Sequence, residues 1–339
     1  MIESIGVVGA GAWGTALAAT ARRAGRDVVL WAREEDVIAS INGSGRNALF
    51  LPDIVLDGVR ATGDLAEMAA HDALLLVVPS QFLSAICRQL KPHLRPHTPV
   101  VLCAKGVELS TGRLMSELVE QELPGSPLAV LSGPTFAIEV ARGLPTAITL
   151  VSSDAALANA LAAALGGPTF RPYVTDDVVG AEMGGAVKNV LAIACGVVEG
   201  RGLGQNARAA LITRGMAEMV RLAVAKGARQ TTCMGLSGLG DLMLTASSTQ
   251  SRNYSLGVAL GQGRALADIL AERRSVAEGV DSAKSVTALA ESLGIDMPIC
   301  RAVAGLVTGR ATIDDIIAGL LSRPFGSELG FDNTSRNPT

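Results

Sequence analysis

A single lysine interrupts a long apolar stretch in the second half of the chain. Lys188 is the only charged residue between Glu182 and Glu199, in the sequence GAEMGGAVKNVLAIACGVVEG, which otherwise has the pattern of a helix that is apolar on nearly all faces. An unpaired charge in such a helix is costly, or it forces the pKa of the lysine down. Either a buried ion pair or a catalytic role would account for Lys188.

Histidine, the most common general acid, is absent from the second half of the chain. All three histidines, His71, His93 and His97, lie in the first third, and we expect them on the surface. A substrate site in the second half therefore needs another acid, and Lys188 is a candidate.

A second cluster of polar residues follows Lys188. Asp241 lies in a glycine-flanked turn, LSGLGDL, and could hold an ammonium in place. The tripeptide Ser251-Arg252-Asn253 opens a predicted helix that extends to Leu260, and an arginine beside helix N–H groups suits a phosphate. The alternatives are an Asx turn at Asp241 and an N-cap with a solvated arginine at the tripeptide.

The elements that must position these residues begin with a dinucleotide-binding pattern. A strand is predicted at residues 3–8, a helix from the glycine motif to about residue 24, and a second strand at residues 27–31. Strand, GxGxxG, helix and strand in this order bind a pyrophosphate through close backbone approach and helix N–H groups. A glycine-rich turn without a ligand is the alternative. The residues of this predicted site are Gly9, Gly11, Ala12, Trp13 and Gly14.

The residues after the second strand bear on the choice of cofactor. NAD-specific folds place an acid there on the ribose hydroxyls, whereas this chain has Ala32 and Arg33, with Glu34 following. A guanidinium at this position suits a 2′-phosphate and favours NADP(H). Arg33 stacked on the adenine would leave NAD(H) usable, so the expected cofactor is NADPH or NADH.

Further apolar strands recur at regular intervals, each followed by a helical pattern. They are predicted at residues 73–78, 100–103, 128–131 and 146–151. This alternation predicts a parallel, doubly wound α/β sheet, in which ligands lie beyond the carboxyl ends of the strands. The loops at 79–80, 104–106 and 132–135 should therefore face one crevice.

Long helical patterns replace this alternation from about residue 175. We expect a dinucleotide-binding Rossmann-type domain at residues 1–176, an all-helical substrate-binding domain at 177–325, and a disordered polar tail at 326–339. The chain has 339 residues, 49% of them apolar and 3% aromatic, which fits closely packed helices and a parallel sheet.

Charge and cysteine usage exclude several classes of protein. The formal net charge of −3 gives no diffuse basic surface, so nucleic acids and anionic membranes are not expected partners. No apolar run has the length expected of a spanning helix, and the N-terminal residues lead into a strand, so we expect a cytoplasmic protein. The spacing of the cysteines predicts buried thiols rather than a metal site. They are Cys87, Cys103, Cys195, Cys233 and Cys300.

In chain order, these motifs resemble the NAD(P)-dependent sn-glycerol-3-phosphate dehydrogenases. The matching segments are GAGAWGTALA, VVPS, AKG, SGPTFAIEVA, GGAVKNVLAI, NARAALITRG, GLGDLMLT and SRN, and the likeness covers residues 1–325. The resemblance implies reversible hydride transfer between NADPH or NADH and dihydroxyacetone phosphate. The product would be sn-glycerol 3-phosphate for phospholipid synthesis. We also expect a homodimer, because apolar helical domains of this kind often pair.

The resemblance also implies roles for individual residues. Lys188 would donate and accept the proton, with Lys105 and Asp241 as the other catalytic residues. The implied substrate contacts are Lys105, Gly133, Thr135, Lys188, Asp241, Ser251, Arg252 and Asn253. The implied cofactor contacts are Trp13, Arg33, Lys105, Ala137, Arg252, Val276 and Glu278. Ala12 stands where the family often has Ser, which removes a hydroxyl contact with the pyrophosphate.

Two further hypotheses concern the chemistry. Lys105 and Lys188 close together should lower the pKa of Lys188 towards the working pH. The alternatives to the implied activity are a related two-domain dehydrogenase of another hydroxy acid and a dinucleotide-binding redox sensor without turnover. Lys188, Asp241 and Arg252 would be superfluous in such a sensor.

Overall fold

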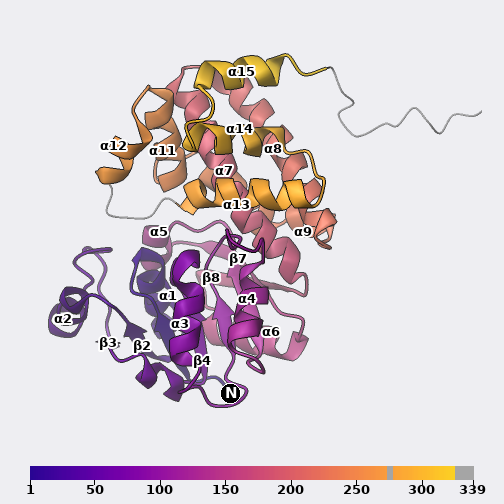
Figure 1. The fold of residues 1–339 in the computed structure, drawn as a ribbon. Helices are drawn as coiled ribbons and strands as arrows, with labels where there is room; N and C mark the ends of the chain where they lie inside the picture. Colours follow the sequence, from indigo (N-terminus) through magenta and orange to yellow (C-terminus); the bar gives the residue numbers. More distant parts are fainter. Residues whose placement is uncertain (273–277, 325–339) are drawn as a thin grey trace, which may run out of the picture.

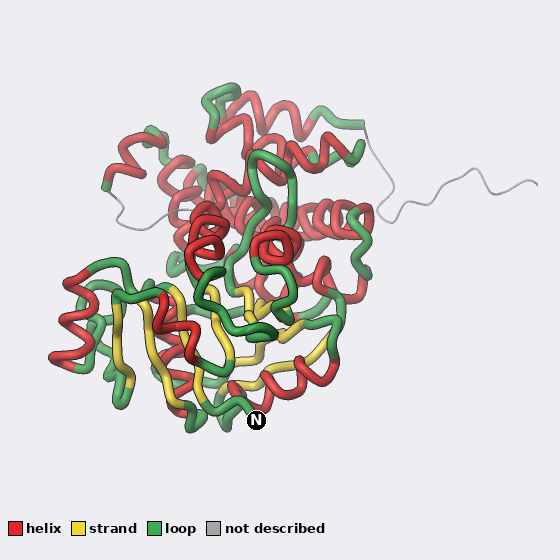
Figure 2. Tube along the Cα trace, turned by 60° about the horizontal axis from the view of Figure 1, so that its bottom comes forward, coloured by secondary structure: helices red, strands yellow, loops and turns green. Residues whose placement is uncertain are grey.

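The chain folds into a layered α/β half and an all-helical half (Figure 1). The computed structural model describes residues 1–272 and 278–324. Figure 2 shows the strands gathered in the half that contains the N-terminus, with helices and loops in the other. The last strand ends at Thr175 and the first long helix of the second half begins at Val178.

Eight strands form one sheet in the order β3-β2-β1-β4-β5-β6-β7-β8. From β1, the chain adds β2 and β3 on one side; it then returns to place β4 on the other side of β1 and continues outward to β8. Such a change of direction is typical of doubly wound folds. The strands are β1 (Ser4–Val8), β2 (Asp27–Trp31), β3 (Val59–Thr62), β4 (Ala73–Leu76), β5 (Val100–Leu102), β6 (Leu128–Ser132), β7 (Thr146–Val151) and β8 (Phe170–Thr175).

The sequence prediction located six of these strands but was wrong about the direction of β7. β7 pairs antiparallel with β6 and parallel with β8, so the sheet is not parallel throughout. The connection from β6 to β7 contains only the five-residue helix α5 (Ala137–Ala141), which is short for a parallel crossover. The prediction missed β3 and β8, the two edge strands, whose polar and exposed positions break the apolar pattern.

Helices cover both faces of the sheet, because alternate strand residues point to opposite sides. Leu75 of β4 belongs to one apolar core, and its neighbours Leu74 and Leu76 belong to the other. The first core includes residues of α1 (Ala12–Arg23), α2 (Glu35–Ser44), α5 and α6 (Ala155–Leu165). The second includes α3 (Leu83–Leu90) and α4 (Met115–Glu122).

The helical half is built around α7 (Val178–Gly200), which packs against α8, α11, α13 and α14. Its other helices are α8 (Gly204–Ala225), α9 (Gln230–Cys233), α10 (Asp241–Thr245), α11 (Arg252–Gly261), α12 (Leu266–Ala271), α13 (Glu278–Ser292), α14 (Pro298–Val307) and α15 (Ile313–Leu321). A π-helical turn, Leu236–Gly240, leads directly into α10.

By length and composition, α7 could cross a membrane, so the expectation that no apolar run is long enough was wrong. However, 89% of its most apolar window is buried within the protein, where it forms the centre of the helical half. The apolar character of α7 is therefore accounted for by burial in a protein core.

Two expectations about single residues have opposite outcomes. His71 is buried rather than on the surface, with its ring Nδ1 3.1 Å from the carbonyl oxygen of Met68. All five cysteines are buried free thiols, as predicted. The predicted tail at 326–339 lies outside the described residues.

The close crossing of α7 and α11 generates a prediction about stability. A Cβ at Gly196 would overlap the carbonyl oxygen of Tyr254, and one at Gly257 would overlap that of Ile193. We expect Gly196→Ala to lower the free energy of unfolding by about 1–3 kcal/mol, measured with denaturant, because the helices must separate.

Gly319→Ala is the matched control. Gly319 is exposed within α15, and a Cβ there would meet no atom within 4 Å. This substitution should leave stability unchanged or raise it by about 0.5–1 kcal/mol. Equal stability of Gly196→Ala and the wild type would contradict a close contact between the backbones of α7 and α11 at Gly196.

Candidate active site

The glycine motif leaves an open space at the N-terminus of α1. Gly11 is the N-cap without a side-chain hydrogen bond, the first turn of α1 contains no acidic residue, and a Cβ at Gly11 would meet no atom within 4 Å. Gly9 has a positive φ of 119°, and a Cβ at Gly14 would overlap the carbonyl oxygen of Gly9. The turn is therefore tight, and its helix N–H groups suit a pyrophosphate.

The residues around this turn can bind the rest of a dinucleotide. Val8 pairs with Trp31, so β1 and β2 end side by side and Arg33 follows at the same end of the sheet. The Arg33 side chain is 75% exposed and 3.1 Å from Glu34. Ala12 and Trp13 are half-buried at the start of α1. An exposed guanidinium at this position fits a ribose with a 2′-phosphate.

Two lysines share one buried carboxylate where the two halves of the chain meet. Lys105 Nζ lies 2.6 Å from Asp241 Oδ2, and Lys188 Nζ lies 2.7 Å from Asp241 Oδ1. Asp241 is 1% exposed, whereas the side chains of Lys188 and Lys105 are 9% and 17% exposed. Lys188 Nζ also donates to Thr245 Oγ1 at 2.9 Å. Each carboxylate oxygen therefore binds one ammonium.

The fold places these three residues from three separate elements. Lys105 lies in the loop after β5, Lys188 lies near the middle of α7, and Asp241 is the first residue of α10. The turn before α10 lies against the loop after β6, since a Cβ at Gly240 would be 3.6 Å from Pro134. The Lys105–Asp241 ion pair therefore joins the carboxyl end of the sheet to the helical half, and the Lys188–Asp241 pair joins α7 to α10 within the helical half.

The environment shifts the pKa values of this cluster in opposite directions. The pKa of Lys188 is lowered to about 8: burial is the largest cause, Asp241 opposes the shift, and the charge of Lys105 adds to it. The sequence-based hypothesis named Lys105 as the cause of a lowered Lys188 pKa, but burial has the larger effect. Burial alone would raise the pKa of Asp241, but its two ammonium partners outweigh burial and lower it. Asp241 is therefore a carboxylate at neutral pH.

The Ser251-Arg252-Asn253 tripeptide forms the N-terminus of α11. Ser251 is its N-cap and accepts a hydrogen bond from the Tyr254 N–H at 3.2 Å, as in the N-cap alternative. Arg252 is exposed in the first turn, and the buried Asn253 accepts a hydrogen bond from the Gly279 N–H at 3.1 Å. A guanidinium beside a helix N-terminus suits a phosphate group.

The structure describes all but one of the remaining predicted residues. Thr135 donates to the carbonyl of Gly133 at 3.3 Å, and Ala137 begins α5. Burial raises the pKa of Glu278, while the nearby charges of Arg252, Lys105 and Lys188 oppose the shift. Val276 lies outside the described residues.

The sequence prediction omitted three polar residues of this region. Thr245 binds Lys188, and its position one helical turn after Asp241 was a usable signal. The buried hydroxyls of Ser132 and Ser237 have no hydrogen-bond partner within the described part of the chain. Both serines lie within segments that the sequence prediction singled out, the loop at 132–135 and the turn LSGLGDL, but neither was assigned a role. In the same part of the chain, no group of three or more His, Cys, Asp or Glu side chains could hold a metal ion.

Comparisons with known proteins agree with this geometry over most of the chain. Residues 4–158 and 177–318 match the N-terminal and C-terminal models of NAD-dependent glycerol-3-phosphate dehydrogenase. A relative from Parvibaculum lavamentivorans, named glycerol-3-phosphate dehydrogenase (NAD(P)+), is 59% identical over 96% of this chain and 98% of its own length. One of the same name from Paramagnetospirillum magneticum is 67% identical over 75% and 93%.

A solved structure extends the agreement from sequence to fold. The crystal structure of glycerol-3-phosphate dehydrogenase from Coxiella burnetii is 39% identical, covers 95% of this chain and 99% of its own, and has a TM-score of 0.91. This match spans both the sheet and the helical half, including the elements that meet at Asp241. The chain therefore belongs to the NAD-dependent glycerol-3-phosphate dehydrogenase family.

Proposed function

We propose that the chain catalyses the reversible reduction of dihydroxyacetone phosphate to sn-glycerol 3-phosphate with NADPH or NADH. Membership of the family supports this reaction. The observation that carries its chemistry is the buried pair of ammoniums on Asp241, beside a turn that suits a pyrophosphate. A ketone that accepts a hydride needs a positive charge and a proton at its oxygen, and this cluster can provide both.

We assign the proton transfer to Lys188. An ammonium has three N–H donors, and the bonds to Asp241 and Thr245 use two of them. The third can donate to the substrate oxygen and then pass its proton to the developing alkoxide. A pKa of about 8 makes Lys188 a stronger acid than an ordinary lysine, so the transfer is easier near neutral pH.

Lys105 and Asp241 support this transfer in different ways. Asp241 fixes both ammoniums through one carboxylate, and the cluster keeps a net positive charge because it contains two ammoniums. That charge is buried, where it stabilises an oxyanion more strongly than it would in water. The bound nicotinamide cofactor supplies the hydride.

The other predicted residues are proposed to hold the substrate phosphate and the cofactor. The phosphate would be held at the N-terminus of α11 by Ser251, Arg252 and Asn253. Binding of the phosphate there would fix the position of the ketone group at the other end of the substrate. Gly133 and Thr135 would complete the substrate contacts. The proposed cofactor residues are Gly9, Gly11, Ala12, Trp13, Gly14, Arg33, Lys105, Ala137, Arg252, Val276 and Glu278.

We further propose a cytoplasmic homodimer whose product supplies glycerophospholipid synthesis. The buried free thiols fit a reducing compartment, and a twofold dimer is the most common assembly of soluble proteins. The proposed domains are residues 1–176 for the cofactor and 177–325 for the substrate. This division is supported by the change from strands to helices between Thr175 and Val178.

The reaction can be tested by following oxidation of NADPH and of NADH separately with dihydroxyacetone phosphate. We expect turnover with the phosphorylated ketone and a KM higher by about tenfold or more for dihydroxyacetone, which lacks the anchor. Arg252→Ala should raise KM for the phosphorylated ketone and narrow the difference between the two substrates. Equal KM values for the two ketones in the wild type would contradict the phosphate site.

Lys188→Met tests the assignment of the proton donor. Methionine retains much of the aliphatic packing, and Asp241 stays paired with Lys105, so the protein should remain folded. We expect kcat to fall by roughly 10²–10⁴-fold while the circular dichroism spectrum stays unchanged. A folded Lys188→Met variant with kcat near that of the wild type would rule out the assignment.

The pKa of Lys188 predicts opposite pH profiles for the two directions. Reduction uses the ammonium, so its kcat should fall as the pH rises through about 8, whereas kcat for oxidation should rise over the same range. Lys105→Met removes a charge that lowers this pKa, so both midpoints should move to higher pH. An unchanged midpoint in Lys105→Met would count against the electrostatic coupling.

A further inference from the structure

Three residues of α7 at regular spacing contact the sheet half or the lysine–carboxylate cluster. Glu182, Gly185 and Lys188 are three residues apart, so they lie on successive turns along a slowly winding stripe of the helix. Lys188 binds Asp241, and the other two contact the chain segment that contains Lys105. The stripe therefore connects α7 to Asp241 and to the segment that contains Lys105. Lys105, Lys188 and Asp241 together form the proposed catalytic cluster.

Glu182 caps the N-terminus of α4 from the neighbouring helix. Its carboxylate accepts the Ser116 N–H at 3.0 Å and also the Ser116 hydroxyl. Glu182 and Ser116 are each 5% exposed, and Ser116 is the second residue of α4. The pKa of Glu182 is raised to about 7: burial is the largest cause, the bonds from Ser116 oppose the shift, and the charge of Glu117 adds to it. A carboxylate at this position also interacts favourably with the helix dipole.

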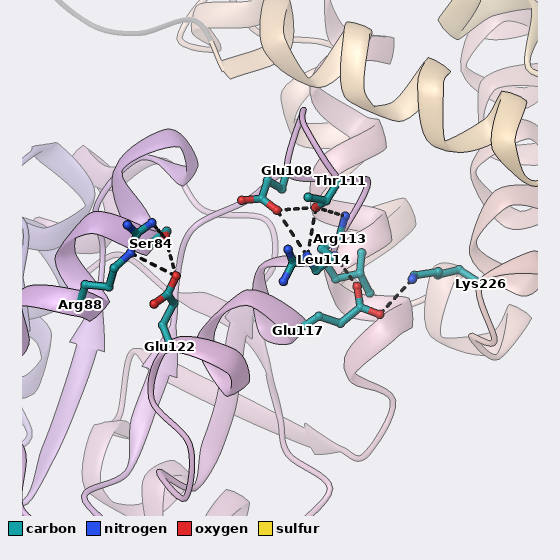
Figure 3. A network of polar contacts seen from close by, with 9 residues as sticks. All are labelled: Ser84, Arg88, Glu108, Thr111, Arg113, Leu114, Glu117, Glu122 and Lys226. Atoms are coloured by element: carbon teal, nitrogen blue, oxygen red, sulfur yellow. Dashed lines mark hydrogen bonds and ion pairs between the residues drawn. The ribbon is translucent and has the colours of Figure 1, made fainter. Parts of the chain in front are cut away.

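The segment between Lys105 and α4 is itself held in a fixed shape. Val107 and Leu114 form a β-bridge, and the Glu108 N–H donates to the Arg113 carbonyl at 2.9 Å. Figure 3 shows the side chains of Glu108, Thr111 and Arg113 joined at the tip of this loop. Because the loop is cross-linked, a movement of the start of α4 is passed on to Lys105.

Gly185 brings the Lys105 side chain onto the same stripe. A Cβ at Gly185 would be 3.3 Å from Cγ and 3.4 Å from Cδ of Lys105, so the aliphatic part of that lysine lies against the α7 backbone. This contact is one helical turn from Glu182 and one from Lys188. Lys105 is thus held at its stem by α7 and at its ammonium by Asp241.

We propose that Glu182 is a positioning residue for the proposed reaction: by anchoring α4 to α7, it holds the Lys105 loop so that both ammoniums reach Asp241. The inference rests on the proposed function, because it assigns Glu182 a role in the geometry of that catalytic cluster. Within the described residues, Glu182 forms no hydrogen bond or ion pair with either lysine or with Asp241, so its effect passes through Ser116 and the loop.

Glu218 provides a matched control for a cap that is structural only. Its carboxylate accepts the Ile299 and Cys300 N–H groups at 2.7 and 3.1 Å, and it is 1% exposed. It therefore caps α14 from α8 as Glu182 caps α4 from α7. α14 supplies none of the proposed catalytic residues, so loss of this cap should affect stability alone.

Lys226 provides a second control at the same end of α4. Figure 3 shows Lys226 reaching Glu117, whose carboxylate also accepts the Leu114 N–H. The Lys226–Glu117 ion pair is 2.9 Å long, with side chains 23% and 41% exposed, so solvent screens it. Lys226→Met should leave kcat and the pH profile unchanged.

The test compares Glu182→Ala, Glu182→Gln and Glu218→Ala in the full chain. We expect Glu182→Ala to lower kcat by roughly ten- to a hundredfold, since small misplacements of catalytic groups have effects of this size. The pH midpoint should move up, towards that of Lys105→Met, because the charge of Lys105 leaves Lys188. In Glu182→Gln, Oε1 can still accept the Ser116 N–H, and Nε2 can donate to the Ser116 hydroxyl in place of accepting from it, so this variant should restore most of the activity. Glu218→Ala should lower Tm without changing kcat or the midpoint.

A second readout is independent of turnover. The chain contains five lysines, so selective ¹³C labelling resolves the Lys188 Cε resonance, and its titration gives the pKa directly. This pKa should rise in Glu182→Ala and stay at the wild-type value in Glu218→Ala. Failure of the proposed function would appear as a wild type inactive on dihydroxyacetone phosphate, whereas this titration would still report the position of Lys105.

Wild-type kcat and an unchanged Lys188 pKa in folded Glu182→Ala would overturn the proposal. If Glu182→Ala does not fold, Ser116→Ala decides, because it removes one of the two bonds and keeps the backbone N–H bond. A smaller shift of the Lys188 pKa in the same direction supports the proposal. An unchanged pKa and kcat in Ser116→Ala would then overturn it.

Discussion

The structure depends on one buried carboxylate that lies between two ammoniums. Asp241 binds Lys105 and Lys188 through separate oxygens, and neither lysine could be buried at this position without it. Removing one partner of such a pair typically costs about 3–5 kcal/mol, because the remaining charge is left uncompensated. The three residues come from the loop after β5, from α7 and from α10. The proposed chemistry therefore requires the sheet half and the helical half to keep a fixed position relative to each other.

α7 shows how this requirement shapes a whole helix. It is 23 residues long and apolar enough to resemble a membrane span, yet it contains Lys188 near its middle. Glycines allow close approach on more than one side, with Gly185 against Lys105 and Gly196 against α11. Because the helix is buried, the interactions of Lys188 lie in a medium of low dielectric constant, where they are stronger than in water. The apolar surface of α7 and its one lysine are thus both part of the same buried site.

The sequence predicted the parts of this protein that local rules determine. GxGxxG after a strand predicted the tight turn at the start of α1, and the one lysine in an apolar stretch predicted a buried ion pair as one alternative for Lys188. The edge strands β3 and β8 lack an apolar pattern, and the direction of β7 depends on pairing with β6, so both escaped prediction. The contact between Lys105 and Asp241 spans 136 residues of sequence, and no spacing rule reveals it. The same holds for Glu182 and Ser116, 66 residues apart.

The second ammonium explains how Lys188 can lose its proton in a buried site. If Asp241 had Lys188 as its sole partner, deprotonation would leave an isolated buried carboxylate, and that cost would raise the pKa of Lys188. Because Lys105 also binds Asp241, the carboxylate stays paired in both protonation states of Lys188. Lys105 therefore lowers the energy of the neutral amine as well as adding positive potential at the oxyanion. In the proposed reaction, proton donation by Lys188 and electrostatic stabilisation of the oxyanion are two consequences of one arrangement, in which Asp241 binds both lysines.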